Sequence, residues 1–144
     1  MKKTLKFILV FALAVATVLA TALTFTACKK DGEDNYESRV YYEDTTLGSG
    51  SKTVTVVISD TEKSVTFTIR TDKKTVGEAL LEHSLIDGED GSYGMYIKSA
   101  NGTVADYDVD QSYWAFYIGE DYAMSGVDST TIEEGVIYKL VYTK

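Results

Sequence analysis

Residues 113–119 read Tyr-Trp-Ala-Phe-Tyr-Ile-Gly, and this stretch contains the chain's only tryptophan. Aromatic residues, which favour strands, occupy four of its first five positions. Side chains alternate between the faces of a strand, so one face would carry Trp114, Phe116 and Ile118 and the other Tyr113, Ala115 and Tyr117. We expect this strand to be central to a small β-rich domain, either as ordinary core or as the wall of a binding surface.

Upstream, two runs of alternating apolar and polar residues predict a β-hairpin. The first run covers residues 53–58 and the second covers residues 65–70. The connecting residues 60–63, Asp-Thr-Glu-Lys, are all polar, as expected of a hairpin loop.

One helix is predicted after the hairpin. Thr75 and Glu78 have the spacing of a capping box, in which each side chain bonds the backbone N–H of the other residue. The apolar helix face would carry Val76, Ala79, Leu80 and Ile86. Asp87-Gly88 would form the turn that ends the helix. His83 lies within this face, either as a metal or acid–base group or as a partly buried helix residue bonded to backbone.

The second half of the chain predicts further strands. Residues 89–91 would form an acidic loop, residues 93–97 a strand, Asn101-Gly102 a tight turn, and residues 136–142 the closing strand. The order strand, strand, helix and several strands predicts an α+β fold. Its specific form would be a β-grasp, a mixed sheet with one packed helix.

Three aspartates at alternate positions resemble the start of a calcium loop. They are Asp106, Asp108 and Asp110. The sixth position of such a loop would be Gln111 instead of glycine, and the twelfth would be Tyr117 instead of glutamate. A solvated acidic loop is therefore favoured over a metal site.

Residues 53–144 resemble the transcobalamin C-terminal-like family, the domain of unknown function numbered 4430. The segments that carry the resemblance are Thr-Val-Gly-Glu-Ala-Leu-Leu at 75–81, Gly-Met-Tyr-Ile at 94–97, Asn-Gly at 101–102, Tyr-Trp-Ala-Phe-Tyr-Ile at 113–118, residues 122–128 and the closing strand from Gly135 to Tyr142. The resemblance implies a β-grasp fold and binding of cobalamin or a similar flat ligand rimmed with amides. The residues it implicates in ligand binding are Tyr96, Tyr113, Trp114, Tyr117 and Tyr122.

This chain departs from the family in two respects. Animal cobalamin carriers clamp the ligand between this domain and a larger helical half, which is absent here. A ligand would therefore be covered from one side only and bound weakly unless a second protein completes the site. The Asn-Gly turn that usually follows the aromatic strand is replaced by Gly119-Glu120.

Residues 1–27 look like a bacterial lipoprotein signal peptide. Three lysines precede an apolar run over residues 7–25, and Thr26-Ala27-Cys28 closes it as a lipobox does. Cys28, the only cysteine, would become the lipid-modified N-terminus. An uncleaved transmembrane anchor and a simple secretory signal are the alternatives. Residues 28–52 are polar and predict a flexible tether, with order beginning at Thr53.

Composition narrows the classes of function. The formal net charge of −8 disfavours nucleic acid as a partner, and a lone cysteine provides neither an intramolecular disulfide nor a zinc quartet. With one histidine and no nucleophile motif, we expect neither an enzyme nor a cofactor. We expect a lipid-anchored, extracytoplasmic lipoprotein at the cell membrane that binds a corrinoid or similar small molecule for uptake. The alternative is a protein-interaction module that meets a transporter or surface protein.

Overall fold

Strands dominate the fold. The computed structural model describes residues 35–144, in which nine strands and two short helices occur. The elements are β1 (Thr45–Gly48), β2 (Lys52–Ser59), β3 (Ser64–Thr71), α2 (Val76–Glu82), β4 (Ile86–Gly91), β5 (Gly94–Ala100), β6 (Thr103–Val104), α3 (Tyr107–Asp110), β7 (Tyr113–Ile118), β8 (Asp121–Tyr122) and β9 (Ile137–Thr143). The predicted α+β class, mostly sheet with few helices, is confirmed.

A six-stranded sheet in the order β1-β3-β2-β9-β7-β8 is the main layer. The predicted hairpin is confirmed as β2 and β3, which pair antiparallel with Val56 opposite Phe67. Strand β9 runs parallel to β2 and antiparallel to β7, so the closing strand lies between the hairpin and the aromatic strand. Segments from both ends of the described chain therefore meet in the middle of one sheet.

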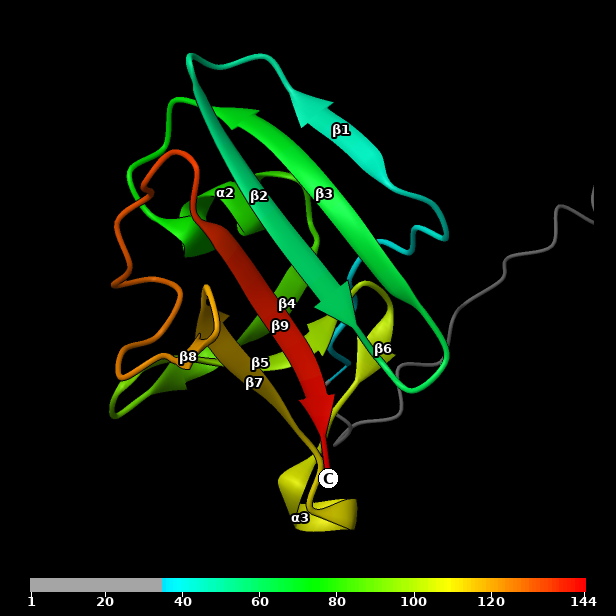
Figure 1. Ribbon diagram of the computed structural model, residues 1–144. Coiled ribbons are helices and arrows are strands. Elements are labelled where there is room, and N and C mark those ends of the chain that lie inside the picture. Colours follow the sequence, from blue (N-terminus) through cyan, green and yellow to red (C-terminus); the bar gives the residue numbers. More distant parts are fainter. Residues whose placement is uncertain (1–34) are drawn as a thin grey trace, which may run out of the picture. The chain divides into compact units, whose positions relative to one another are not determined.

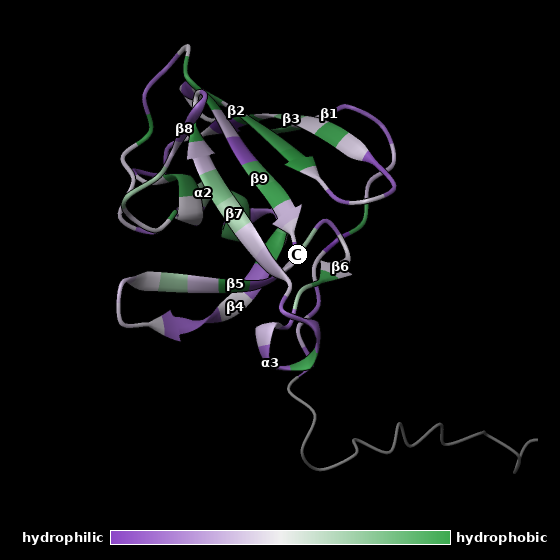
Figure 2. Ribbon diagram, turned by 60° about the horizontal axis from the view of Figure 1, so that its bottom comes forward, coloured by the Kyte–Doolittle hydropathy of each residue, from purple (hydrophilic) through white to green (hydrophobic). Residues whose placement is uncertain are grey.

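The core lies on one face of this sheet. Figure 1 shows α2 behind the large sheet, and Figure 2 shows β4 and β5 as a separate layer on that side. The fully buried side chains include Val56, Phe67, Leu80, Tyr138 and Leu140. They come from β2, β3, α2 and β9, whose apolar faces pack against one another and are thereby removed from water.

Helix α2 begins where predicted but ends earlier. Thr75 caps it, and both bonds of the capping box with Glu78 are present. The helix ends at Glu82, and Ser84 has a positive φ of 55° that turns the chain. The expected helical position of Ile86 is wrong, because Ile86 begins β4 and lies opposite Ala100 of β5.

The expected turn at Asp87-Gly88 and the acidic loop over 89–91 are also strand. Both belong to β4, whose backbone pairs antiparallel with β5. The polar residues of this segment predicted a loop. It is a strand because its backbone bonds to β5, and the local sequence pattern carries no sign of that pairing.

The acidic stretch 106–110 contains a helical turn instead of a loop. The Asp106 carboxylate caps α3 by accepting the Asp108 N–H at 3.0 Å. Asp110 accepts hydrogen bonds from Ser112 and, at 2.7 Å, from the Lys144 ammonium. Two of the three aspartates are therefore used in local structure, and a capping role explains the residue at position 106.

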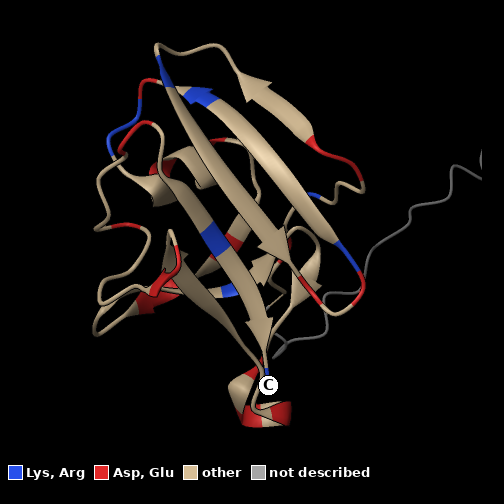
Figure 3. Ribbon diagram, in the orientation of Figure 1, with Lys and Arg blue, Asp and Glu red and all other residues tan. Residues whose placement is uncertain are grey.

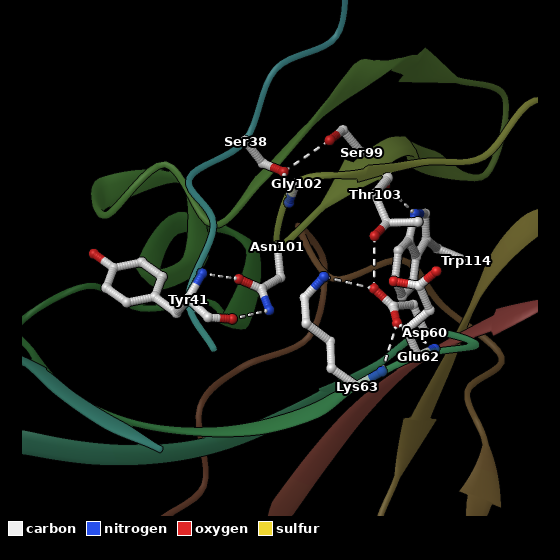
Figure 4. Close-up of polar contacts among 10 residues, drawn as sticks. All are labelled: Ser38, Tyr41, Asp60, Glu62, Lys63, Ser99, Asn101, Gly102, Thr103 and Trp114. Atoms are coloured by element: carbon white, nitrogen blue, oxygen red, sulfur yellow. Dashed lines mark hydrogen bonds and ion pairs between the residues drawn. The ribbon is translucent and has the colours of Figure 1, made fainter. Parts of the chain in front are cut away.

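Residues 35–52 are bound to the domain and are not a free tether. Strand β1 pairs parallel with β3, with Leu47 opposite Ile69. Before β1, the Tyr41 backbone bonds the Asn101 side chain, and the Ser38 hydroxyl bonds that of Ser99 at 2.7 Å (Figure 4). The expected start of order at Thr53 is therefore wrong. The local sequence did not indicate this order, because the partners of Ser38 and Tyr41 lie about 60 positions away in the sequence.

The remaining N-terminal predictions fall outside the described residues. They are the signal peptide over 1–27, the lipidation of Cys28 and the first part of the tether. Within the part of the chain that the structure describes, no helix is long and apolar enough to cross a membrane.

Candidate functional site

A hollow of about 190 Å³ lies beside the aromatic strand β7. It is formed by β5, β7, β8 and the loop over residues 123–127 that follows β8. Its lining is composed of Tyr93, Met95, Tyr96, Ile97, Trp114, Phe116, Tyr122, Ala123, Met124, Ser125, Gly126 and Val127. We call this feature the aromatic hollow.

The floor of the aromatic hollow is held rigidly. Trp114 and Phe116 are only 7% and 8% exposed, and each packs on a tyrosine of β9. The Trp114 ring contacts the Tyr142 ring edge-on, with 5.7 Å between the ring centroids, and the Phe116 ring stacks on the Tyr138 ring, with 6.2 Å between the centroids. The Trp114 indole N–H also donates to the Thr103 carbonyl at 3.2 Å, which satisfies its one polar group.

The rim carries large side chains that face solvent. Tyr93 is 94% exposed, Met124 is 97% exposed and Tyr122 is 56% exposed. Exposed apolar groups beside a concavity are typical of a surface that contacts a ligand or partner. The aromatic hollow therefore has a fixed floor and an exposed rim.

Asp128 positions one wall by joining the 123–127 loop to β5. Its carboxylate accepts the Met95 N–H at 2.9 Å, directly beside Gly94. A Cβ at Gly94, whose φ is +107°, would lie 2.6 Å from the Asp128 Oδ1 atom. The Val127 carbonyl accepts the Gly77 N–H at 2.8 Å, which ties the same loop to the start of α2. A glycine at position 94 is therefore required for this close approach.

A polar cluster supports the floor from behind (Figure 4). Asp60, in the β2–β3 turn, accepts hydrogen bonds from the Thr103 hydroxyl at 2.6 Å and from the Lys63 ammonium at 2.9 Å. Burial alone would raise the pKa of Asp60, but the hydrogen bonds from Thr103 and Lys63 outweigh it and hold the pKa well below its usual value. Thr103, whose carbonyl bonds Trp114, is thereby fixed to the main sheet.

The structure separates the five tyrosine and tryptophan positions implicated by resemblance. Tyr96, Trp114 and Tyr122 all line the aromatic hollow. Tyr113 and Tyr117 do not line it, because strand alternation directs them to the opposite face of the sheet. Tyr117 contacts the hollow only indirectly, through an edge-on ring contact with Tyr122 at 5.5 Å.

Sequence reasoning did not single out several residues of the hollow. Met124 and Ser125 lie in the loop after β8 and share no period with the strands. Tyr93 has the strand spacing with Met95 and Ile97 but lies in the turn just before β5. The one available signal was a large aromatic residue beside a glycine in a polar, turn-forming stretch, as in Tyr93-Gly94.

His83 lies away from the aromatic hollow, at the end of α2. Its Nε2 atom is buried without a hydrogen-bond partner and lies 3.9 Å from the Glu82 carboxylate. Among the described residues, no group of three or more His, Cys, Asp or Glu side chains is placed to hold a metal ion.

The lining of the aromatic hollow suits binding by contact and stacking. Its side chains are mostly aromatic, aliphatic or thioether, and polar atoms share the surface of the hollow with them. Such a surface favours a flat or aliphatic group that carries a few hydrogen-bonding substituents at its edge.

No protein-family profile matches the chain, and no curated protein matches it. Among solved structures, it is similar to a "putative metal binding protein" from Ruminococcus gnavus, with 29% identity and a TM-score of 0.61. That match covers 65% of this chain and 98% of the other. The chain also matches haptocorrin in complex with Cbi, with 21% identity and a TM-score of 0.49, over 67% of this chain and 26% of haptocorrin.

Proposed function

We propose that this protein is a membrane-anchored, extracytoplasmic binding lipoprotein without catalytic activity that captures a corrinoid or a similar small molecule for uptake. The N-terminal sequence supports the anchor, with Cys28 as the lipidated residue. The sequence resemblance to the transcobalamin C-terminal-like family supports the ligand class. The strand order supports the β-grasp arrangement, since β2 and β9 are parallel neighbours in the middle of the sheet.

The observation that carries the proposal is the aromatic hollow with its exposed rim. At about 190 Å³ it is smaller than the 300–1,000 Å³ typical of small-molecule sites. It would therefore admit one edge of a corrin ring, while the rest of the ring lies across Tyr93, Tyr122 and Met124. A ligand held in this way stays half exposed, and a second protein such as a transporter component could cover it.

The test is a titration of the full-length protein, in a neutral detergent, with cyanocobalamin and dicyanocobinamide. Isothermal calorimetry and the corrinoid absorbance spectrum are followed together. We expect saturable heat and a spectral change with at least one of the two compounds. Absence of both signals up to millimolar corrinoid would contradict the proposed ligand.

A matched pair of variants locates the binding surface. Tyr122 and Tyr107 are each 56% exposed, but Tyr107 lies on α3 and does not line the aromatic hollow. Tyr122→Ser should weaken corrinoid binding about tenfold, the cost of one lost aromatic contact, while Tyr107→Ser should leave it unchanged. Equal loss in both variants would argue against this site.

Lipidation is tested separately from ligand binding. Mass spectrometry of the mature protein from a bacterial host should find cleavage before Cys28 and a diacylglyceryl mass on that residue. Cys28→Ser should abolish the added mass. An unmodified Cys28 in a protein that retains residues 1–27 would instead favour the uncleaved anchor.

A protein-interaction role is the second candidate, and the outer face of the large sheet favours it. In Figure 2 this face points away from α2 and from the β4–β5 layer. It carries half-buried Val57, Tyr113, Tyr117 and Val141, with Lys139 as its central charge. A photo-crosslinking side chain at position 117 should yield a defined adduct in cells. The same group at Tyr42, which is 80% exposed, is the control.

A further inference from the structure

A second hollow, of about 450 Å³, lies at the other end of the large sheet. The β1–β2 connection, the end of β3 and the end of α2 enclose it, and it shares no lining residue with the aromatic hollow. Its charged and titratable side chains are Arg70, Asp72, Lys73, Glu82 and His83. We call it the polar hollow.

The two carboxylates of the polar hollow are already bound within the protein. Asp72 accepts hydrogen bonds from the Ser51 N–H at 2.9 Å and the Ser51 hydroxyl at 2.8 Å. These two bonds lower the pKa of Asp72. Glu82 accepts a hydrogen bond from the Thr71 hydroxyl at 2.8 Å. Both acidic groups therefore have donors of their own and are less available to a ligand.

The basic side chains of the polar hollow are held less closely, since Lys73 acts on the Glu78 carboxylate only through its charge and the His83 Nε2 atom lies 3.9 Å from the Glu82 carboxylate. Neither Arg70 nor Lys73 forms an ion pair with any described carboxylate, and the His83 Nε2 atom is buried without a hydrogen bond. A buried polar atom without a partner costs free energy unless something outside the protein supplies one.

Basic residues gather at this end of the large sheet. The chain has a net charge of −8, yet four of the nine lysine and arginine residues in 35–144 are Lys52, Arg70, Lys73 and Lys74. Figure 3 shows this basic group at the top of the large sheet, where the Lys52 ammonium donates to the Lys73 carbonyl at 3.1 Å. The carboxylates of Asp72, Glu78 and Glu82 lie among these cations and offset their net charge, so attraction of an anion to this end depends on direct bonds from individual donors.

We propose that the polar hollow binds a small organic anion whose oxyanion, a carboxylate or a phosphate, is held by Arg70 and Lys73. The planar guanidinium of Arg70 can donate two parallel hydrogen bonds to either oxyanion, and Lys73 adds a compact positive charge. The bound anion also offers an acceptor next to His83. The volume lies in the range of small-molecule sites, so the hollow has room for more than an inorganic ion.

The test uses His83 as its reporter, because it is the only histidine in the chain. The imidazole C–H signals of the full-length protein in neutral detergent are followed by proton NMR at fixed pH. Succinate, glycerol 3-phosphate, inorganic phosphate and sodium chloride are titrated at matched ionic strength. We expect a saturable shift of the His83 signals with succinate or with glycerol 3-phosphate, and none with chloride.

The three anions distinguish the source of the oxyanion. A response to succinate alone identifies a carboxylate ligand, and one to glycerol 3-phosphate alone identifies a phosphorylated ligand. A response to inorganic phosphate alone, with neither organic anion bound, would contradict an organic ligand.

Two variants and a control of equal charge change make the proposal falsifiable. Arg70→Gln and Lys73→Gln should each weaken the anion about tenfold, as loss of a charge-assisted bond predicts. Lys139→Gln removes the same charge on the outer sheet face and should leave binding unchanged. A His83 shift that follows ionic strength alone, or that persists equally in all three variants, would overturn the proposal. The corrinoid titration tests the aromatic hollow, so failure of the corrinoid proposal and failure of the anion proposal can be told apart.

Discussion

Asn101 and Tyr41 exchange two hydrogen bonds across 60 positions of sequence. The Tyr41 N–H donates to the Asn101 side-chain oxygen at 2.7 Å, and the Asn101 amide donates to the Tyr41 carbonyl at 3.0 Å. Asn101 is 1% exposed and has a φ of +45°, so one residue both forms the turn after β5 and binds the N-terminal segment. Asparagine suits both roles, because it tolerates a left-handed backbone and carries a donor and an acceptor.

Replacing Asn101 should therefore loosen the N-terminal segment. Asn101→Gly keeps the backbone freedom of the turn but removes both side-chain bonds, leaving the partly buried backbone groups of Tyr41 unpaired. We expect a loss of about 2 kcal/mol in the free energy of unfolding, measured by urea denaturation. Replacement of Asn35, whose side chain bonds only the exposed Glu37, should cost far less. Equal losses in the two variants would contradict the assigned role.

Removal of residues 35–52 should destabilise the domain. A fragment of residues 53–144 would lack β1 and would expose Phe67, which Tyr41 covers edge-on at 5.5 Å. We expect its free energy of unfolding to be at least about 3 kcal/mol lower than that of residues 35–144, because apolar burial and hydrogen bonds are lost. Hydrogen exchange should show faster exchange of β3, which becomes an edge strand. Equal stability of the two fragments would show that the N-terminal segment adds nothing.

Gly94→Ala should strain the wall of the aromatic hollow. The new Cβ would lie 2.6 Å from the Asp128 carboxylate in a residue with a φ of +107°. We expect a loss of about 2 kcal/mol in thermal or urea unfolding. Gly119→Ala is the control, because its φ is +63° but no atom lies within 4 Å of the added Cβ. That variant should lose about 1 kcal/mol, the backbone cost alone. A larger loss at position 119 would refute the close contact with Asp128.

Asp60 should make stability depend on pH in the acid range. Its folded-state pKa lies below the usual value of 3.8, so its ionised form contributes stability above about pH 4. That contribution is lost as the pH falls through the folded-state pKa. Asp60→Asn should be about 2 kcal/mol less stable at pH 7, and the difference should shrink steadily between pH 4 and pH 2. Denaturation curves at several pH values measure it, and a difference that stays constant would contradict the mechanism.

Asp110 provides a contrast for the Asp60 experiment. Hydrogen bonds from Lys144 and then from Ser112 lower the pKa of Asp110 to about 2. This pair lies at the surface, so dissolved salt should screen it. Salt at about 0.5 M is on the order of the concentrations that screen exposed ion pairs. In such salt the pH-dependent loss of stability in Asp110→Asn should fade, whereas most of the loss in Asp60→Asn should persist.

Local patterns were sufficient for the elements whose partners are near in sequence. The β2–β3 hairpin and the Thr75–Glu78 capping box depend on contacts within about twenty residues of sequence, and both were predictable. The two faces of β7 also follow directly from strand alternation. Trp114 and Phe116 line the aromatic hollow and Tyr113 and Tyr117 do not, while Ala115 on the second face is buried as well.

Elements stabilised by distant partners were not predictable. Ile86 continued the helical pattern of α2, but pairing with β5 made it strand. Strand β1 has a polar, glycine-containing sequence typical of a linker, and it is a strand because β3 offers it a free edge.

The sequence by itself determined which residues of the aromatic strand share a face, because alternation is a local property of extended backbone. Only the tertiary structure decided which face borders a hollow, since the other walls come from β5, β8 and the 123–127 loop. For this reason Trp114 and Tyr96 line the hollow together, whereas Tyr113 and Tyr117 do not line it. Tyr122, the cross-strand partner of Tyr117, lines the hollow from the edge strand β8. The polar hollow depends equally on the fold, because Arg70 and His83 meet only where the ends of β3 and α2 come together.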